Sequence, residues 1–352
     1  MTPNVNYSTG SSRGKFYQIR GIGERSEFTE PVNYSVGVII DGIDFTGIAL
    51  GASTFDIKQV EILRGPQGTL YGANALAGLV NMISNDPTEV FYSEIKGLIS
   101  EYGGRNIDAI ISGSTYNNIG YRVGISNSKS NGYVDNVYLN KDDTNNLDET
   151  IARAKFTKNF KDSNLTLNIF YADIDNGYDA FSLDNTRITY SDEPGYDRQQ
   201  TNAASLRIEK NLQNKNRIEF LISYADSDLE YAFDEDWSNT GICKNTPCDS
   251  STYGFDWWYS SFDSFERNNT NHSIDIRYIS GSLDFPWVIG IYNRAQDINL
   301  NREYTYLEND FKSSFDTKNS AIYGQLEGKI NENLKITTGI RFEKRKADNL
   351  EN

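Results

Sequence analysis

From residue 91 onward, hydrophobic and polar residues alternate along most of the chain. Leu165, Leu167 and Ile169, for example, alternate with Thr166 and Asn168. A period of two places the apolar side chains of a strand on one face and the polar side chains on the other. The pattern predicts about eleven strands, which span 91–101, 105–115, 119–130, 147–159, 163–174, 199–211, 215–230, 264–280, 284–302, 312–329 and 333–346.

The links between these strands alternate in length. Short links at 116–118, 160–162 and 212–214 are interleaved with long ones at 131–146 and 231–263. Tight turns on one side and long loops on the other are typical of outer-membrane barrels, whose tilted strands need about 9–11 residues to cross a bilayer. The pattern therefore favours antiparallel strands of a transmembrane β-barrel, with apolar faces toward lipid and polar faces toward a wet lumen.

The first 90 residues are organised differently. Glycine-rich turns separate four short apolar pieces, which are predicted as strands at 17–21, 36–42, 60–65 and 79–84. The pieces at 55–60 and 73–78 are predicted as short helical turns. The fold class expected for the whole chain is mainly β, with a small α+β domain at 1–90 followed by the incomplete barrel at 91–352.

Composition excludes several classes of function. Asp and Glu number 49 against 34 Lys and Arg, for a net charge of −15, which argues against a nucleic-acid partner. The single histidine rules out a metal site built from several histidines and leaves little scope for general acid–base catalysis at neutral pH. We therefore expect no enzyme activity, no catalytic residue, no cofactor and no resident metal.

An ordered series of motifs lies in the N-terminal region. YQIRGIG at 17–23 is followed by VGVIIDG at 36–42, VEILRGPQGTLYG at 60–72 and ANALAGLVNMIS at 73–84. This series resembles the plug domain of TonB-dependent outer-membrane receptors. The resemblance implies that 1–90 is a plug and that 91–352 is the N-terminal half of the receptor barrel, in the outer membrane of a Gram-negative bacterium.

The resemblance also implies a function. Family members take up a scarce ligand, typically a ferric siderophore or a similar complex, and the TonB energy-coupling protein drives the step. The expected partners are thus TonB, outer-membrane lipid and a small-molecule ligand. A passive porin is an alternative that the plug motif argues against, because a diffusion pore needs no such domain. A ligand-sensing signalling receptor is another, and it would need an additional N-terminal domain.

The sequence departs from the family pattern at both ends. Residues 1–15 carry neither a signal peptide nor the box that contacts TonB, and the chain ends at 352 after about eleven strands. Plugged transporters have about 22 strands. We therefore expect an interior fragment of a longer product, and the function assigned is that of the parent protein.

Several plug residues receive roles from the resemblance. Charged residues on the short strands are expected to face charges of the barrel, and glycines and a proline to shape the turn after them. The residues expected to take part in plug anchoring and gating are Arg20, Glu61, Arg64, Gly65, Pro66, Gly68 and Gly72. Ordinary surface ion pairing is the alternative interpretation.

The loops at 22–33 and 43–54 are expected to point toward the outside of the cell. The candidate ligand contacts at this plug apex are Arg25, Glu27, Glu30, Asp44 and Phe45. The alternative is a solvated loop without a binding role, since most loop residues are functionally idle.

The longest link, 231–263, contains both cysteines. The spacing of Cys243 and Cys248 and their expected external position favour a small disulfide over free thiols. Acidic residues also gather in the long links, at Asp173, Asp175, Asp179 and Asp184 and at Asp234, Glu235, Asp236 and Asp249. They could bind Ca²⁺ through several carboxylate oxygens, but a solvated acidic surface is the favoured interpretation.

Overall fold

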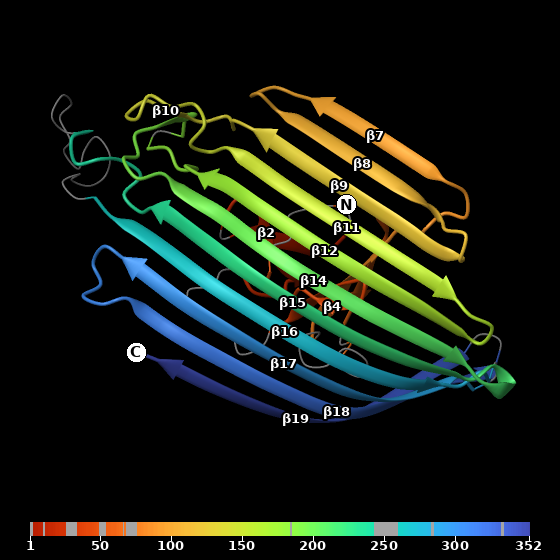
Figure 1. Cartoon of the computed structure of the whole chain (residues 1–352). Coiled ribbons are helices and arrows are strands. Elements are labelled where there is room, and N and C mark those ends of the chain that lie inside the picture. Colours follow the sequence, from red (N-terminus) through yellow and green to blue (C-terminus); the bar gives the residue numbers. More distant parts are fainter. Residues whose placement is uncertain are drawn as a thin grey trace.

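A single curved antiparallel sheet of eleven strands dominates the computed structural model (Figure 1). The structure describes residues 3–9, 11–25, 34–48, 54–65, 67, 76–183, 185–242, 260–282, 285–331 and 334–352. In this part of the chain, no helix is long and apolar enough to cross a membrane.

Each strand of the large sheet pairs with its neighbours in sequence, except that the short β10 and β13 lie outside it. The eleven predicted strands are confirmed, and most extend beyond the predicted ends. They are β7 Tyr92–Ile99, β8 Arg105–Ser114, β9 Ile119–Ser130, β11 Leu147–Asn159, β12 Ser163–Tyr178, β14 Gly195–Asn211, β15 Arg217–Asp234, β16 Phe262–Ile279, β17 Trp287–Tyr304, β18 Phe311–Asn331 and β19 Leu334–Glu351.

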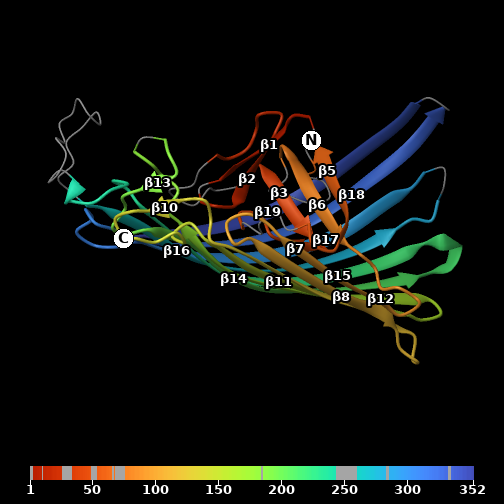
Figure 2. The ribbon, with the colours of Figure 1, turned by 90° about the horizontal axis from the view of Figure 1, so that it is seen from above.

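The N-terminal residues form two small sheets on the concave side of the large one (Figure 2). One is the hairpin of β1 (Val5–Thr9) and β2 (Gly14–Ile19), and the other has the strand order β4-β3-β6-β5. The bounds of this second sheet are β3 Val36–Ile40, β4 Ile43–Asp44, β5 Ile57–Arg64 and β6 Gly78–Ser84. We call these residues the N-terminal domain.

The helical turn expected at 55–60 is wrong. Residues from Ile57 onward belong to β5, which pairs antiparallel with β6. The strand β6 hydrogen-bonds with this segment. Pairing with a neighbouring strand outweighs a weak local preference for a helical turn. The other expected turn, at 73–78, lies largely outside the described residues, and its last residue begins β6.

The main hydrophobic core lies between the N-terminal domain and the large sheet. Apolar residues of β2, β3 and β6 meet apolar residues of β11, β12, β14 and β15. Phe45 is fully buried, and its ring packs edge-on against Phe170 of β12 with the ring centroids 5.3 Å apart. The face of the large sheet that takes part in this core is called the inner face, and the opposite one the outer face.

Two bands of side chains cross the strands on the outer face, an apolar band and a polar band. One row of directly paired residues crosses seven strands and is entirely apolar, and it consists of Leu165, Ile208, Phe220, Ile276, Ile291, Ile322 and Phe342. Nearer the ends of the strands that carry long links, a second row consists of Asp175, Arg198, Glu230, Glu266, Asn301 and Lys312. Side chains of the apolar row such as Ile291 remain 47% exposed, so this band is apolar surface without a protein partner.

The two ends of the large sheet differ as the sequence predicts. At the short-turn end, β14 and β15 are joined by the 3₁₀ turn η2, Gln213–Lys215. At the long-loop end, β10 (Asp135–Asn136) pairs in parallel with β13 (Ile188–Thr189), so two long links hydrogen-bond to each other. Parts of two long loops are therefore packed against each other.

Candidate functional site

Polar contacts between the N-terminal domain and the inner face form the candidate site. Near the short-turn end, the carboxylate of Asp56 accepts three hydrogen bonds from the guanidinium of Arg122 on β9. The Nε atom of Arg122 lies 3.0 and 2.8 Å from Oδ1 and Oδ2, and its terminal nitrogen lies 2.6 Å from Oδ1. Asn85 donates a further hydrogen bond to Oδ1 at 2.9 Å. Both charged side chains are at least 90% buried, so both charges are largely shielded from water.

A second contact surrounds the ammonium group of Lys155 on β11. Its Nζ atom donates to the carbonyl oxygen of Ser84 at 2.8 Å and lies 3.6 and 3.5 Å from carboxylate oxygens of Asp41 and Asp86. The hydroxyl of Ser205 on β14 donates to the carbonyl oxygen of Asp41 at 2.7 Å. This side of the N-terminal domain is therefore held through two strands, β11 and β14, which lie on either side of β12.

A third contact lies at β4. A carboxylate oxygen of Asp44 is 3.1 Å from the guanidinium of Arg294 on β17, and the amide of Asn271 donates to the Asp44 carbonyl oxygen at 3.0 Å. Asp44 was predicted as a contact of the plug apex with a ligand, but here it bonds to the sheet. Its neighbour Phe45 has no exposed surface, so contact with a ligand would require the N-terminal domain to rearrange.

The fourth contact lies at the long-loop end, and its charges are reversed. Arg13, at the tip of the β1–β2 hairpin, donates to both carboxylate oxygens of Asp197 on β14 at 3.2 and 2.5 Å and to the amide oxygen of Gln199 at 2.5 Å. The Ser12 hydroxyl donates to the same carboxylate at 2.7 Å. Arg13 and Asp197 are 5% and 3% exposed, so the hairpin tip is held in a buried polar pocket.

These contacts can hold the domain in one position while leaving it separable from the sheet. A buried ion pair contributes little net stability, because desolvation offsets the attraction, but its geometry is specific and loss of one partner is costly. Acidic residues of the domain meet basic residues of the sheet near the short-turn end, and the arrangement is reversed at the hairpin tip. The domain is thus held in register by four polar contacts around an apolar core.

Sequence reasoning missed most of these residues. Arg122, Lys155 and Arg294 occupy inward positions of their strands, where the period-two pattern marks them only as polar. Asp56 and Asp41 have φ values of 54° and 50°, so each lies in a tight turn of the kind that aspartate tolerates. An acidic residue in a turn of the N-terminal domain was the available signal, but its partner could not be identified from the sequence.

The residues that the resemblance implied for anchoring lie elsewhere. Glu61 accepts hydrogen bonds from Gln59 and Asn81, at 2.8 and 2.9 Å, within the small sheet. Arg20 and Arg64 are exposed and have no side-chain hydrogen bond or ion pair with any described residue. Gly65 has φ = 95°, a conformation that favours glycine. A role for these residues in anchoring or gating stays a prediction.

Other predicted site residues fall partly outside the described chain. Arg25 is described and exposed. The remaining ones, which are Glu27, Glu30, Pro66, Gly68, Gly72, Cys243 and Cys248, lie outside the described residues. Their predicted roles, including the loop disulfide, stay predictions.

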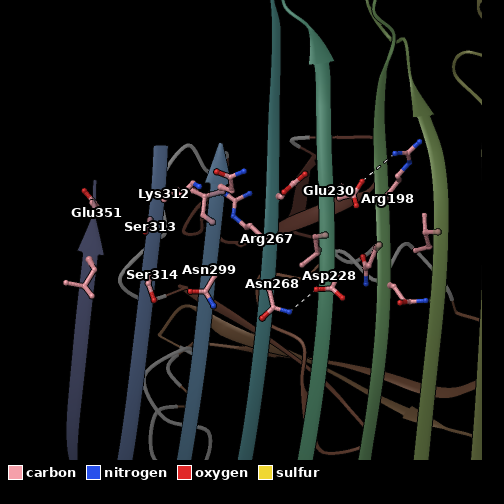
Figure 3. Close-up of a pocket in the computed structure, with 18 of the residues that line it drawn as sticks. Arg198, Asp228, Glu230, Arg267, Asn268, Asn299, Lys312, Ser313, Ser314 and Glu351 are labelled. Carbon is pink, nitrogen blue, oxygen red and sulfur yellow. Dashed lines mark hydrogen bonds and ion pairs between the residues drawn. The ribbon is translucent and has the colours of Figure 1, made fainter. Parts of the chain in front are cut away.

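A broad groove on the sheet lies away from these contacts (Figure 3). It is lined by polar side chains such as Arg198, Asp228 and Asn268, with an ion pair from Arg198 to Glu230 and a hydrogen bond from Asn268 to Asp228. Asp197 and Ser227, which alternate with Arg198 and Asp228, are buried against the inner face. The groove therefore follows the polar band of the outer face and is not a passage beside the N-terminal domain.

The acidic residues of the long links are not uniformly solvated, which corrects the favoured interpretation. Asp173 and Asp175 are exposed, but Asp179, Asp234 and Asp236 are 5%, 6% and 2% exposed. Asp184 and Asp249 lie outside the described residues, and Glu235 is exposed. The links pack on one another, so an acidic residue in them can become buried.

Comparison with known proteins identifies the N-terminal domain. Residues 1–79 match the family model described as TonB-dependent Receptor Plug Domain. The chain is a TonB-dependent receptor plug domain followed by barrel strands. The four contacts described above are therefore contacts between a plug and the inner wall of a receptor barrel, and the predicted fold class is confirmed as mainly β.

Curated relatives match part of this region. The chain is 30% identical to the pesticin receptor of Yersinia pestis over 101 residues, which are 28% of this chain and 15% of that receptor. It is 45% identical to the catecholate siderophore receptor Fiu of Escherichia coli K12 over 53 residues, 15% of this chain and 7% of the relative. The chain thus matches only a small share of each relative's length.

Solved structures match the whole chain in fold. The ferric yersiniabactin uptake receptor FyuA of Yersinia pestis superposes with a TM-score of 0.81 at 18% identity, over 100% of this chain and 54% of FyuA. The pyoverdine outer-membrane receptor FpvA of Pseudomonas aeruginosa gives a TM-score of 0.70 at 15% identity, over 99% and 53% of the two chains. The chain therefore spans about half the length of these receptors, whose family resides in the outer membrane of Gram-negative bacteria.

The apolar band of the outer face predicts how the barrel strands sit in lipid. Ile291→Arg, at the middle of the band, is expected to destabilise the purified receptor in lipid by about 2–4 kcal/mol, because a charge there must be buried in hydrocarbon. Urea titration followed by tryptophan fluorescence measures this change.

The matched control for this variant is Asn299→Arg, on the same strand and face but in the polar band. We expect it to change stability by less than about 1 kcal/mol, because the new charge stays at the headgroups or above them. Equal losses from the two arginine variants would contradict this placement of the membrane.

Proposed function

We propose that this chain forms the plug and part of the barrel wall of a receptor that takes up a metal chelate of the siderophore type, with TonB as the source of energy. The observation that supports the proposal is a plug domain seated on the inner face of a barrel wall. A plug of this kind blocks free diffusion, so passage of a ligand requires the plug to move or rearrange. The ligand class is inferred from similar proteins, which are the pesticin, catecholate siderophore and ferric yersiniabactin receptors.

The positions of the contacts suggest the order in which the plug detaches from the wall. Asp56, Asp41 and Asp44 meet basic residues of the wall nearer the short-turn end, which faces the periplasm in this proposal. A pull from the periplasm would act first on these pairs, and water entering the gap would screen them as they separate. The contact of Arg13 with Asp197 lies at the other end and would hold the hairpin until the lower contacts have opened.

No covalent chemistry is part of this proposal. The family consists of non-enzymatic transporters, and the groups described above are paired in ways that position the plug. The ligand would be released unchanged into the periplasm.

The test is uptake of radiolabelled iron by cells that carry the complete receptor as their sole route for a panel of ferric siderophores. We expect accumulation of at least one chelate that requires both the receptor and TonB. Entry that continues without TonB would favour a passive pore. Saturable binding without accumulation, accompanied by a transcriptional response, would favour a signalling receptor.

A further inference from the structure

The long-loop end contains buried oxygen atoms that form no well-aligned hydrogen bond with any described residue. They are the Oγ atoms of Ser191 and Ser238 and the Oδ2 atoms of Asp234 and Asp236. The four residues are between 0% and 6% exposed. A buried oxygen without a partner carries the full cost of desolvation, which is largest for a carboxylate.

Hydrogen bonds hold the segments that carry these oxygens together. The backbone N–H of Asp192 donates to the carbonyl oxygen of Ser238 at 2.9 Å, and the amide of Asn239 donates to the carbonyl oxygen of Tyr190 at 2.8 Å. The N–H of Ser261 donates to Oδ1 of Asp236 at 2.8 Å. Segments 190–192, 234–239 and 260–261 are therefore one packed unit formed from two long links.

Each of the two carboxylates accepts main-chain hydrogen bonds through Oδ1, whereas Oδ2 has no well-aligned hydrogen bond to any residue that the structure describes. Oδ1 of Asp234 accepts from the N–H groups of Asp236 and Trp237 at 3.1 and 2.9 Å, and Oδ1 of Asp236 accepts from Ser261. No Lys or Arg among the described residues forms an ion pair with either aspartate. Two buried carboxylates side by side without a cation repel each other, and this repulsion needs a compensating positive charge or a proton.

The buried carboxylate of Asp179, at the same end of the sheet, has several hydrogen-bond donors. One oxygen of Asp179 accepts from the amide of Asn136 and from the hydroxyls of Thr144 and Thr189, at 2.9, 2.8 and 2.7 Å. Asp179 therefore needs no ion. Among the described residues, no comparable set of side-chain donors surrounds Oδ2 of Asp234 or Asp236, which distinguishes this pair from an ordinary loop contact.

We propose that Asp234 and Asp236, with the hydroxyls of Ser191 and Ser238, bind one divalent cation of the calcium type. Calcium accepts six to eight oxygen ligands in flexible geometry, including carboxylates and water, whereas magnesium demands a near-octahedral set. The described residues contain no group of three or more His, Cys, Asp or Glu side chains arranged to hold a metal, so the hydroxyls and water complete the coordination. The cation joins two long links and is independent of the transported chelate.

The test is calorimetric titration of the purified receptor with CaCl₂ after chelation, with terbium emission excited through the adjacent Trp237 as a second readout. We expect one site with a Kd of about 10⁻⁴–10⁻³ M, the range of extracellular calcium modules. Asp236→Asn should weaken binding at least tenfold, and Ser238→Ala should weaken it less. Hydrogen exchange of 262–279 verifies that each variant is folded.

The matched control is Asp316→Asn. Asp316 lies in an exposed row on the outer face, directly paired with Asp297 and Asp348, and therefore offers a second acidic cluster of similar charge. We expect Asp316→Asn to leave the affinity for calcium unchanged. The proposal is overturned if the wild type binds no calcium, if Asp236→Asn binds it equally well, or if Asp316→Asn removes the binding. Uptake of iron by the same variants is scored separately, so failure of either proposal is distinguishable.

Discussion

Replacing Arg122 by alanine is expected to increase hydrogen exchange in plug segments 54–64 and 78–91 by about 100-fold or more. The substitution leaves the Asp56 carboxylate buried without its charged partner, and breaking a buried ion pair costs about 3–5 kcal/mol. Each 1.4 kcal/mol corresponds to a tenfold change in the opening equilibrium, which exchange reports directly. Mass spectrometry of the exchanged receptor, with a barrel peptide from 262–279 as reference, measures it.

Two further variants separate this effect from a general loss of surface charge. Lys58→Ala removes the pair with Asp86, whose side chains are 52% and 57% exposed, and should leave the exchange of these segments nearly unchanged because water screens the pair. Adding Asp56→Asn to Arg122→Ala removes the orphaned charge, and asparagine tolerates the φ of 54° at this position. The double variant should recover part of the protection. A single-variant loss no larger than that of Lys58→Ala would refute this role of the pair.

Phe45→Ala is the second substitution with a large expected effect. The ring has no exposed surface and packs against Phe170, which in turn lies 4.9 Å below the guanidinium of Arg153. Truncation of a buried phenylalanine leaves a cavity and costs about 3–5 kcal/mol. We expect the plug to open locally, with faster exchange across β3 and β6, while the barrel strand β18, which is paired on both sides, keeps its protection.

Val60→Ala is the control for the loss of side-chain volume. Val60 belongs to the same domain but is 44% exposed, so its truncation should cost less than about 1 kcal/mol. If Phe45→Ala instead behaves like Val60→Ala and weakens binding of the ligand, the original expectation of a ligand contact at Phe45 is supported over a packing role.

The sequence determined the architecture to a large extent. Alternation of apolar and polar residues is set by the geometry of a strand, so eleven strands and their two faces could be read from positions such as Leu165 and Ile276. Alternation of short and long links followed from the turn residues. The motif series from YQIRG to LVNMIS located the plug through its resemblance to a known family.

The partners of the charged residues were decided by the tertiary structure alone. Ser12 and Asp197 are 185 residues apart, and their contact depends on where the hairpin tip meets β14. Arg122 and Asp56 meet only because the plug docks at a particular position along the barrel strands. Local patterns carry no information about such docking, which is why Glu61 was expected to contact the barrel and instead bonds within its own sheet.

Contacts between distant segments, and not the local sequence, also decided which loop residues are buried. Asp175 and Asp236 look alike in the sequence, as acidic residues at the edge of a long link, yet one is exposed and the other is 2% exposed. The difference arises because segments 190–192 and 234–239 of two long links pack together through contacts such as the hydrogen bond between Asp192 and Ser238. The sequence determined strands, faces and the plug, while the meeting of distant segments determined which polar groups lost their water and required a partner.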